Sequence, residues 1–189
     1  MGARVREGIE RRSGTDRVSV SSHTLGYRAD VLRGEELPPG ILVRPMREAD
    51  VGCVAKIESS AFSTPWKATT FRGLLNRPGA ALLVLEVPPA PVAGYAVLWC
   101  IQDQGELANI TVTPEFRNRR LGAYLLDRVL NEARERTVES LYLEVRVSNF
   151  RARSMYASRG FEEIGVRRDY YENPREDARV LMKRLASTP

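Results

Sequence analysis

Histidine and cysteine are scarce in this chain. Among 189 residues there is one histidine, His23, and there are two cysteines, Cys53 and Cys100. The cysteines do not form a metal-binding or redox spacing, and we expect both to be reduced and buried. This scarcity argues against a histidine dyad or a metal centre, so acid–base chemistry must come from carboxylates, tyrosines or lysines.

Long apolar runs are lacking as well. The sequence contains no run of about eighteen apolar residues, and its basic start is not followed by an apolar segment with a cleavage site. We therefore expect a cytoplasmic protein with no membrane association. A hydrophobic content of 43% in 189 residues is enough for one well-buried domain.

Positive charge is in modest excess, with a formal net charge of +5. Such an excess attracts phosphates and would permit nucleic-acid binding. Acidic residues are interspersed along most of the chain, however, and the dense basic cluster consists of Arg117, Arg119 and Arg120 in one turn. A polyphosphate ligand explains this cluster more economically than a duplex, so we do not expect stable nucleic-acid binding.

The composition changes near residue 40. Residues 1–39 are rich in Arg, Ser, Gly and Glu, show no sustained apolar period, and end in Pro38-Pro39. We predict a flexible N-terminal extension over 1–39 and a single domain over 40–189.

Apolar periodicity predicts four helices and seven strands in the order β-α-α-β-β-β-α-β-α-β-β. In the second helix Thr64 is expected to cap and Pro65 to take the first helical position. Short connections favour antiparallel neighbours, whereas the strand–helix–strand unit over 106–147 favours a parallel pair. The fold class is therefore α/β (α+β), with a mixed, mainly antiparallel sheet flanked by helices. Helices are predicted over 51–61, about 65–75, 121–135 and about 150–159; strands begin at 41, 81, 92, 106 and 140, after 161 and at 178, with a loop over 169–176.

The segment 109–126 reads as a β-branched strand, a basic turn and the first turns of an amphipathic helix. Backbone N–H groups at the start of a helix lack intrahelical acceptors, and the helix dipole adds positive charge there. Such a turn suits a pyrophosphate. The alternative is plain architecture, because strand–turn–helix units with arginines also occur without a ligand.

Two side chains near the following strand are candidates for chemistry. Alternation over 141–147 places Glu144 mid-strand on the face opposite Leu143, where a carboxylate must be paired, solvated through a cleft, or used. The structural alternative is a salt bridge to Arg146 or to a neighbouring strand. Asn149 is expected to cap the next helix, and Tyr156 lies on the same stripe of that helix, where core packing is the alternative.

Several motifs together resemble the GNAT N-acetyltransferases. The turn Arg117 to Gly122 is similar to their acetyl-CoA motif Q/R-x-x-G-x-G/A, with Arg120 in place of the first glycine. The order and spacing of the further motifs resemble one subgroup, the bacterial ribosomal-protein alanine N-acetyltransferases or RimI group, over about residues 41–185. These motifs are Asn109-Ile110-Thr111-Val112, Leu143-Glu144-Val145-Arg146, Ser148-Asn149, Tyr156 to Phe161, Arg167 to Tyr171 and Arg175 to Ala178.

The resemblance implies a GNAT fold and roles for individual residues. Glu144 would be the proton acceptor and Tyr156 the proton donor, with acetyl-CoA as co-substrate and no metal. Asn149 would add a contact to the co-substrate. The acetyl acceptor would be a ribosomal protein N-terminus, most specifically the N-terminal alanine of small-subunit ribosomal protein 18. Backbone of Ile110, Thr111 and Val112 would hold the pantetheine arm and thioester, and the turn Asn118, Arg119, Arg120, Leu121, Gly122 and Ala123 would hold the pyrophosphate.

Arg120 is the main departure from the motif. A positive φ at this point would cost arginine about a kilocalorie per mole or more, whereas a helical conformation would leave arginine harmless. We favour the helical conformation.

Three aromatic residues, Trp66, Tyr170 and Tyr171, are candidate walls for a peptide, with ordinary packing as the alternative. The acidic residues of the loop could meet a basic ribosomal protein, or simply be solvated. Two other functions stay open: a broader N-terminal or lysine ε-acetyltransferase, and a non-catalytic CoA-sensing or ribosome-associated module. The acidic loop residues are Glu172, Glu176 and Asp177.

Overall fold

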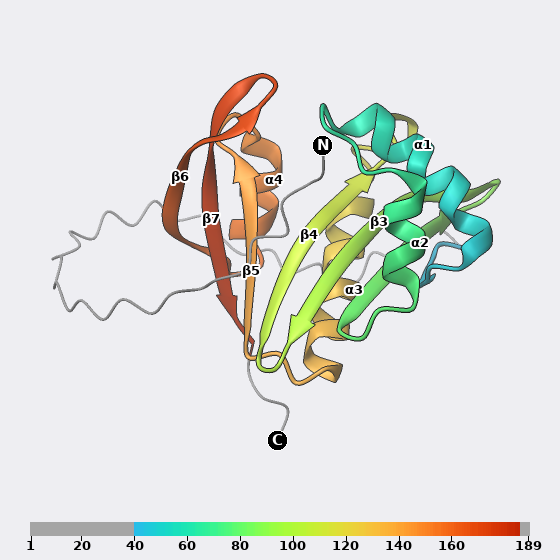
Figure 1. Ribbon diagram of the computed structural model, residues 1–189, viewed down its shortest axis with the longest axis horizontal. Coiled ribbons are helices and arrows are strands. Elements are labelled where there is room, and N and C mark those ends of the chain that lie inside the picture. The colour runs from blue at the N-terminus through green and yellow to red at the C-terminus, as the bar shows by residue number, and fades with distance from the viewer. Residues whose placement is uncertain (1–39, 186–189) are drawn as a thin grey trace, which may run out of the picture. The chain divides into compact units, whose positions relative to one another are not determined.

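One mixed sheet of seven strands forms the centre of the molecule (Figure 1). The structure is a computed structural model and describes residues 40–185. The predicted flexible extension at 1–39 therefore lies outside the described residues. The strands are β1 (Leu42–Pro45), β2 (Ala80–Val87), β3 (Ala90–Ile101), β4 (Gln104–Val112), β5 (Ser140–Arg146), β6 (Glu162–Glu172) and β7 (Arg175–Arg184).

The spatial order of the strands is β1-β2-β3-β4-β5-β7-β6. β4 and β5 are parallel, and the other neighbours are antiparallel. The predicted fold class and the predicted parallel pair are both confirmed. The parallel pair arises because a full helix lies between these two strands in the sequence, whereas short turns join most of the others.

Helices cover both faces of the sheet. Buried residues of the first two helices pack with β2 and β3 in one hydrophobic cluster, and the third and fourth helices pack in a second cluster on the opposite face. No helix within residues 40–185 is long and apolar enough to cross a membrane. The α-helices are α1 (Val51–Ala61), α2 (Ala68–Leu75), α3 (Leu121–Glu135) and α4 (Phe150–Ala157).

Three expectations about local structure are wrong. The second helix begins at Ala68 with Lys67 as its N-cap, so neither Thr64 nor Pro65 starts it. The predicted loop over 169–176 is mostly strand, because β6 continues to Glu172 and β7 begins at Arg175. Cys53 is exposed on the outer side of α1, whereas Cys100 is half-buried.

The parallel contact between β4 and β5 is short. Ladder pairs join Gln104–Glu106 to Ser140–Tyr142, and within the described residues the ladder does not continue beyond them. A bulge at Ala108 bends β4 at that point, since Val97 opposes Asn109 while Leu98 opposes Leu107. The two strands therefore splay apart toward their carboxyl ends, as Figure 1 shows. We call this opening the β4–β5 splay.

Candidate active site

Glu144 lies mid-strand in β5, on the sheet face that α1 and α2 cover. Leu143 and Val145 on either side of it belong to the cluster on the opposite face. The Glu144 side chain is only 14% exposed, and its Oε1 lies 3.1 Å from Nη2 of Arg167. Burial raises the pKa of this carboxyl, and the charge of Arg167 opposes that shift. Of the two pairings considered, Arg146 is not the partner; the cation comes from β6.

Tyr156 combines a buried ring with a hydroxyl that is not used by the fold. Its ring packs edge-on against Phe161, with centroids 5.6 Å apart, within the α3–α4 cluster. The ring of Tyr156 therefore does pack in the core, as the structural alternative expected. The hydroxyl makes no hydrogen bond to another residue in the described part of the chain. Burial raises the pKa of Tyr156 above its usual value, so the hydroxyl stays protonated at neutral pH.

Glu144 and Tyr156 start from opposite faces of the sheet, and Tyr171 connects their surroundings. The charge of Glu144 contributes to a pKa of about 12 for Tyr171, although burial is the larger cause. Tyr171 in turn contributes to the raised pKa of Tyr156. Within the described residues, β4 and β5 have no ladder pairs beyond Glu106 and Tyr142, so the backbone of the sheet is not continuous between these strands there.

The strand beside the splay presents free backbone on one edge. Ile110, Thr111 and Val112 pair with β3 on their other side, opposite Ala96, Tyr95 and Gly94. A side chain at Gly94 would place a Cβ 2.6 Å from the Thr111 carbonyl oxygen, so the close strand contact there requires glycine. The β5 side of this segment has no strand partner among the described residues. The Val112 carbonyl accepts a hydrogen bond from Nε of Arg117 at 2.9 Å, and the other backbone groups on this edge are available to hydrogen-bond an extended ligand.

The predicted pyrophosphate turn has the geometry of an open helix N-terminus. The N-cap of the 15-residue helix α3 is Arg120, and no side chain caps it. The first intrahelical bond runs from the Tyr124 N–H to the Arg120 carbonyl at 3.0 Å. The preceding N–H groups of Leu121, Gly122 and Ala123 have no intrahelical acceptor, which suits an anion.

The expected helical conformation of Arg120 is wrong. Its φ is 58° and its ψ is 5°, in the left-handed region, and Asn118 two residues earlier also has a positive φ of 66°. Arginine in this conformation costs roughly 1–2 kcal/mol relative to glycine, because Cβ crowds the following carbonyl. The first glycine of the family pattern is thus replaced at a position where glycine is conformationally favoured.

Gly122 is not required by the protein's own packing. Its φ is not positive, and an added Cβ would meet Met155 at 3.7 Å and Val112 at 3.9 Å, which are ordinary contacts. Glycine in a helix is less stable than alanine by about 1 kcal/mol. A close ligand is a physical reason for glycine at this position.

The substitution Gly122→Ala should therefore raise the free energy of unfolding by up to about 1 kcal/mol while weakening CoA binding. Gly73→Ala is the matched control, since Gly73 is also helical with nothing near its absent side chain. It should gain similar stability with unchanged CoA affinity. Denaturant melts and CoA titrations of both variants check this; equal CoA affinity in the two variants would contradict a ligand at Gly122.

Asn149 is the N-cap of α4, as expected. Its side-chain oxygen accepts a hydrogen bond from the Ala152 N–H at 3.2 Å. This bond leaves its side-chain nitrogen for a ligand contact.

Of the candidate peptide walls, Trp66 lies in the α1–α2 loop, and Tyr170 and Tyr171 lie near the end of strand β6. Trp66 packs against Phe71, with ring centroids 5.8 Å apart, and Tyr171 stacks on Arg146 in the β6–β7 hairpin.

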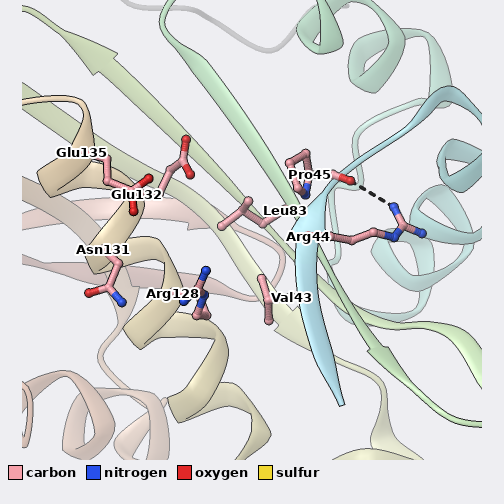
Figure 2. A pocket seen from close by; sticks show the side chains of 8 residues that line it. All are labelled: Val43, Arg44, Pro45, Leu83, Arg128, Asn131, Glu132 and Glu135. Carbon is pink, nitrogen blue, oxygen red and sulfur yellow. Dashed lines mark hydrogen bonds between the residues drawn. The ribbon is translucent and has the colours of Figure 1, made fainter. Parts of the chain in front are cut away.

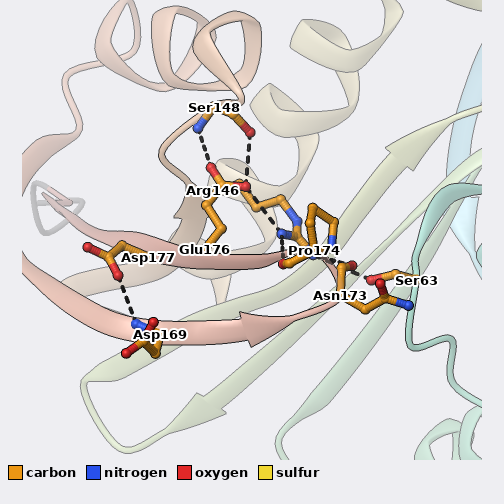
Figure 3. A network of polar contacts seen from close by, with 8 residues as sticks. All are labelled: Ser63, Arg146, Ser148, Asp169, Asn173, Pro174, Glu176 and Asp177. Carbon is orange, nitrogen blue, oxygen red and sulfur yellow. Dashed lines mark hydrogen bonds and ion pairs between the residues drawn. The ribbon is translucent and has the colours of Figure 1, made fainter.

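The acidic residues of the same hairpin differ in their contacts. Glu176 accepts hydrogen bonds from Ser148 and Arg146, and Asp177 accepts one from the Asp169 N–H, so both stabilise the hairpin (Figure 3). Glu172 is exposed.

Glu58, a carboxylate of α1 that is only 1% exposed, is a polar residue of this region that the sequence pattern did not predict. It accepts hydrogen bonds from the Trp66 N–H at 2.9 Å, from the Tyr95 hydroxyl, and from the Asn109 side-chain amide at 3.2 Å. It thereby ties the α1–α2 loop to the strand beside the splay. The available signal was its spacing, since Glu58 lies four residues after Val54 on the apolar stripe of the helix.

Burial raises the pKa of Glu58, and this predicts a pH-dependent effect of Glu58→Gln. A carboxyl with a raised folded-state pKa favours folding below its unfolded pKa and loses that contribution as pH rises through the folded value. The glutamine variant lacks this loss. Its melting temperature relative to the parent protein should therefore rise between pH 4 and pH 7, as thermal unfolding at both pH values measures. If this difference in melting temperature decreased between pH 4 and pH 7, the raised pKa of Glu58 would be contradicted.

A small hollow elsewhere is not the co-substrate site. It holds about 60 Å³ between β1 and the C-terminal half of α3 (Figure 2). This volume accommodates a few water molecules and not an acyl-CoA. Its lining includes Val43, Arg128 and Glu132.

The sequence matches a known protein family. The model of the acetyltransferase (GNAT) family matches residues 53–161, more than half of the chain. The chain belongs to the acetyltransferase (GNAT) family. GNAT membership confirms the predicted fold, and acetyl-CoA is the co-substrate that this family uses.

Individual relatives are similar over most of the domain. The [ribosomal protein bS18]-alanine N-acetyltransferase of Salmonella typhimurium is 36% identical over 70% of this chain and 89% of its own length. The crystal structure of the ribosomal-protein-S18-alanine N-acetyltransferase from Escherichia coli has a TM-score of 0.72 at 30% identity, covering 79% of this chain and 96% of that one. The ribosomal-protein-alanine N-acetyltransferase of Brucella melitensis has a TM-score of 0.68 at 26% identity, covering 76% and 99%.

Proposed function

We propose that this GNAT enzyme transfers acetyl from acetyl-CoA to the N-terminal alanine of small-subunit ribosomal protein 18. The observation that carries this proposal is a mostly buried carboxylate, Glu144, which lies mid-strand in β5 and is paired with Arg167. We infer that it works together with the Tyr156 hydroxyl, which no residue of the described chain engages. Relatives named for this reaction support the choice of substrate. Ribosomal proteins are cytoplasmic, so the proposal places the reaction in the cytoplasm.

Glu144 is suited to remove a proton from the acceptor. A protein α-amine has a pKa of about 7.7–8.0, so much of it is protonated at neutral pH and cannot attack a thioester. Burial raises the pKa of Glu144 and makes it a stronger base than an exposed carboxylate, while Arg167 keeps the ionised form accessible. Glu144 would accept this proton through a water molecule.

The residues expected around acetyl-CoA would stabilise the negative charges of the co-substrate and of the reaction intermediate. Free backbone N–H groups on the β5 side of Ile110 to Val112 would donate to the thioester oxygen as it becomes an oxyanion. The first-turn N–H groups of α3, with the basic turn Asn118 to Ala123, would hold the pyrophosphate, and Asn149 would add a contact. No metal or covalent enzyme intermediate is needed.

Tyr156 would act on the sulfur. Collapse of the tetrahedral intermediate releases a thiolate, and a thiol has a pKa near 8.5. Because burial raises the pKa of Tyr156, complete proton transfer to sulfur is uphill. A hydrogen bond from the tyrosine hydroxyl to the leaving sulfur stabilises the thiolate without complete transfer.

Two other functions are distinguishable by one assay. A broader enzyme would also acetylate lysine side chains, and a CoA-binding module would bind CoA without turnover. Incubation of acetyl-CoA with peptides matching the S18 N-terminus, with and without a blocked α-amine, followed by mass spectrometry, separates the three. The proposal requires acetyl on the free α-amine and none on the blocked peptide; acetyl on lysine of both peptides, or on neither peptide despite CoA binding, would overturn it.

A further inference from the structure

Arg146 lies at the centre of a polar network that joins β5, the β6–β7 hairpin and the α1–α2 loop (Figure 3). It is the last residue of β5, two positions after Glu144 and on the same face. Its Nη1 donates to the Pro174 carbonyl at 3.0 Å and to Glu176 at 3.2 Å. Its Nη2 donates to the Asn173 carbonyl at 3.0 Å and lies 3.4 Å from the Ser63 hydroxyl of the α1–α2 loop.

These contacts occupy the outer end of the guanidinium. Both terminal nitrogens are engaged with the protein, and Glu176 is itself fixed by the Ser148 N–H at 2.5 Å and the Ser148 hydroxyl at 3.0 Å. Arg146 is therefore poorly placed to bind a substrate directly. A planar fork held by two carbonyls and a carboxylate instead fixes the hairpin at one angle to β5.

The flat face of the same guanidinium lies on Tyr171. The distance from the guanidinium carbon to the ring centroid is 4.1 Å, which is within the range of a cation–π contact. Strand β6 thus contributes two side chains near Glu144: Arg167, which pairs with the carboxylate, and Tyr171, which rests on the neighbouring arginine. Tyr171 therefore lies against Arg146, two residues along β5 from Glu144.

We propose that Arg146 is a positioning residue that fixes Tyr171, with its hydroxyl, and the β6–β7 hairpin beside Glu144. The inference rests on the proposed function and extends it, because it names the residue that orders the hairpin beside the proposed base. Lysine at position 146 keeps the charge but cannot bridge two carbonyls and a carboxylate while stacking on a ring. Loss of the arginine contacts would let the hairpin and Tyr171 shift together.

A double-mutant cycle tests this dependence. Arg146→Lys should lower kcat/KM for an α-amine peptide by roughly tenfold to a hundredfold, as small displacements in an active site do, with unchanged CoA affinity. Tyr171→Phe should also lower kcat/KM. If Arg146 acts through the Tyr171 hydroxyl, kcat/KM of the double variant should be no more than about twofold below that of the less active single variant. Arg175→Lys is the control, since Arg175 pairs with Asp169 in the same hairpin but is 75% exposed.

Amide hydrogen exchange provides a readout that does not depend on turnover. Arg146→Lys should speed exchange in the β6–β7 hairpin, whereas Arg175→Lys should not. Multiplicative losses in the double variant, full activity of Arg146→Lys, or equal loss of CoA affinity would overturn the inference while leaving the proposed function intact. Absence of α-amine acetylation by the unmodified protein would overturn both.

Discussion

Glu144→Gln should slow acetylation of an α-amine peptide by about 10²- to 10⁴-fold, the usual contribution of a positioned general base. Glutamine has nearly the same shape and keeps an oxygen beside Arg167, but it loses the ion pair and cannot take a proton. CoA affinity should stay within about twofold, because the residues expected to hold the pyrophosphate lie in the turn before α3 and not in β5. Steady-state kinetics and CoA titration measure the two quantities separately.

The pH dependence of kcat adds a second criterion. A base must be ionised, so activity should fall as pH decreases through the raised pKa of Glu144. This acidic limb should vanish from the residual activity of Glu144→Gln. Parallel losses in turnover and CoA affinity, or an unchanged acidic limb, would contradict the base role.

Tyr156→Phe should reduce kcat by about 10²-fold while leaving the fold intact. The ring, which packs against Phe161, is retained, and the hydroxyl has no hydrogen-bond partner to lose among the described residues. The melting temperature should therefore change little. The loss should depend on the leaving group, because a better leaving thiol needs less help from the hydroxyl.

Thioesters of more acidic thiols test that dependence. With such a donor, the difference in kcat between Tyr156→Phe and the parent protein should become smaller. Phe161→Leu is a structural control: it disturbs the same ring contact, so it should lower the melting temperature more than it changes leaving-group dependence. A gap that stays constant across donors would be inconsistent with hydrogen bonding to sulfur.

Much of the fold follows from periodicity. The apolar stripe from Leu121 to Val129 and the alternation around Glu144 predict α3 and β5 nearly to the residue. The parallel pairing of β4 and β5 follows from the helix between them. These features are local, so sequence spacing alone carries them.

The remainder depends on contacts between distant segments. The hairpin over 169–176 looks like a loop because it is polar, yet Arg146 and Ser148 hold Glu176 from another part of the chain. The left-handed Arg120 is set by the turn it closes and not by its own preference. The burial of Glu58 requires donors from Trp66, Tyr95 and Asn109, which no local pattern indicates.

The most direct test of the two-residue chemistry is a crystal structure with CoA covalently joined to the α-nitrogen of an S18 N-terminal peptide. We expect the analogue to pass through the β4–β5 splay, with its sulfur within about 3.2 Å of the Tyr156 hydroxyl and its nitrogen one water from Glu144. An analogue bound with either side chain out of reach of the junction would contradict the account.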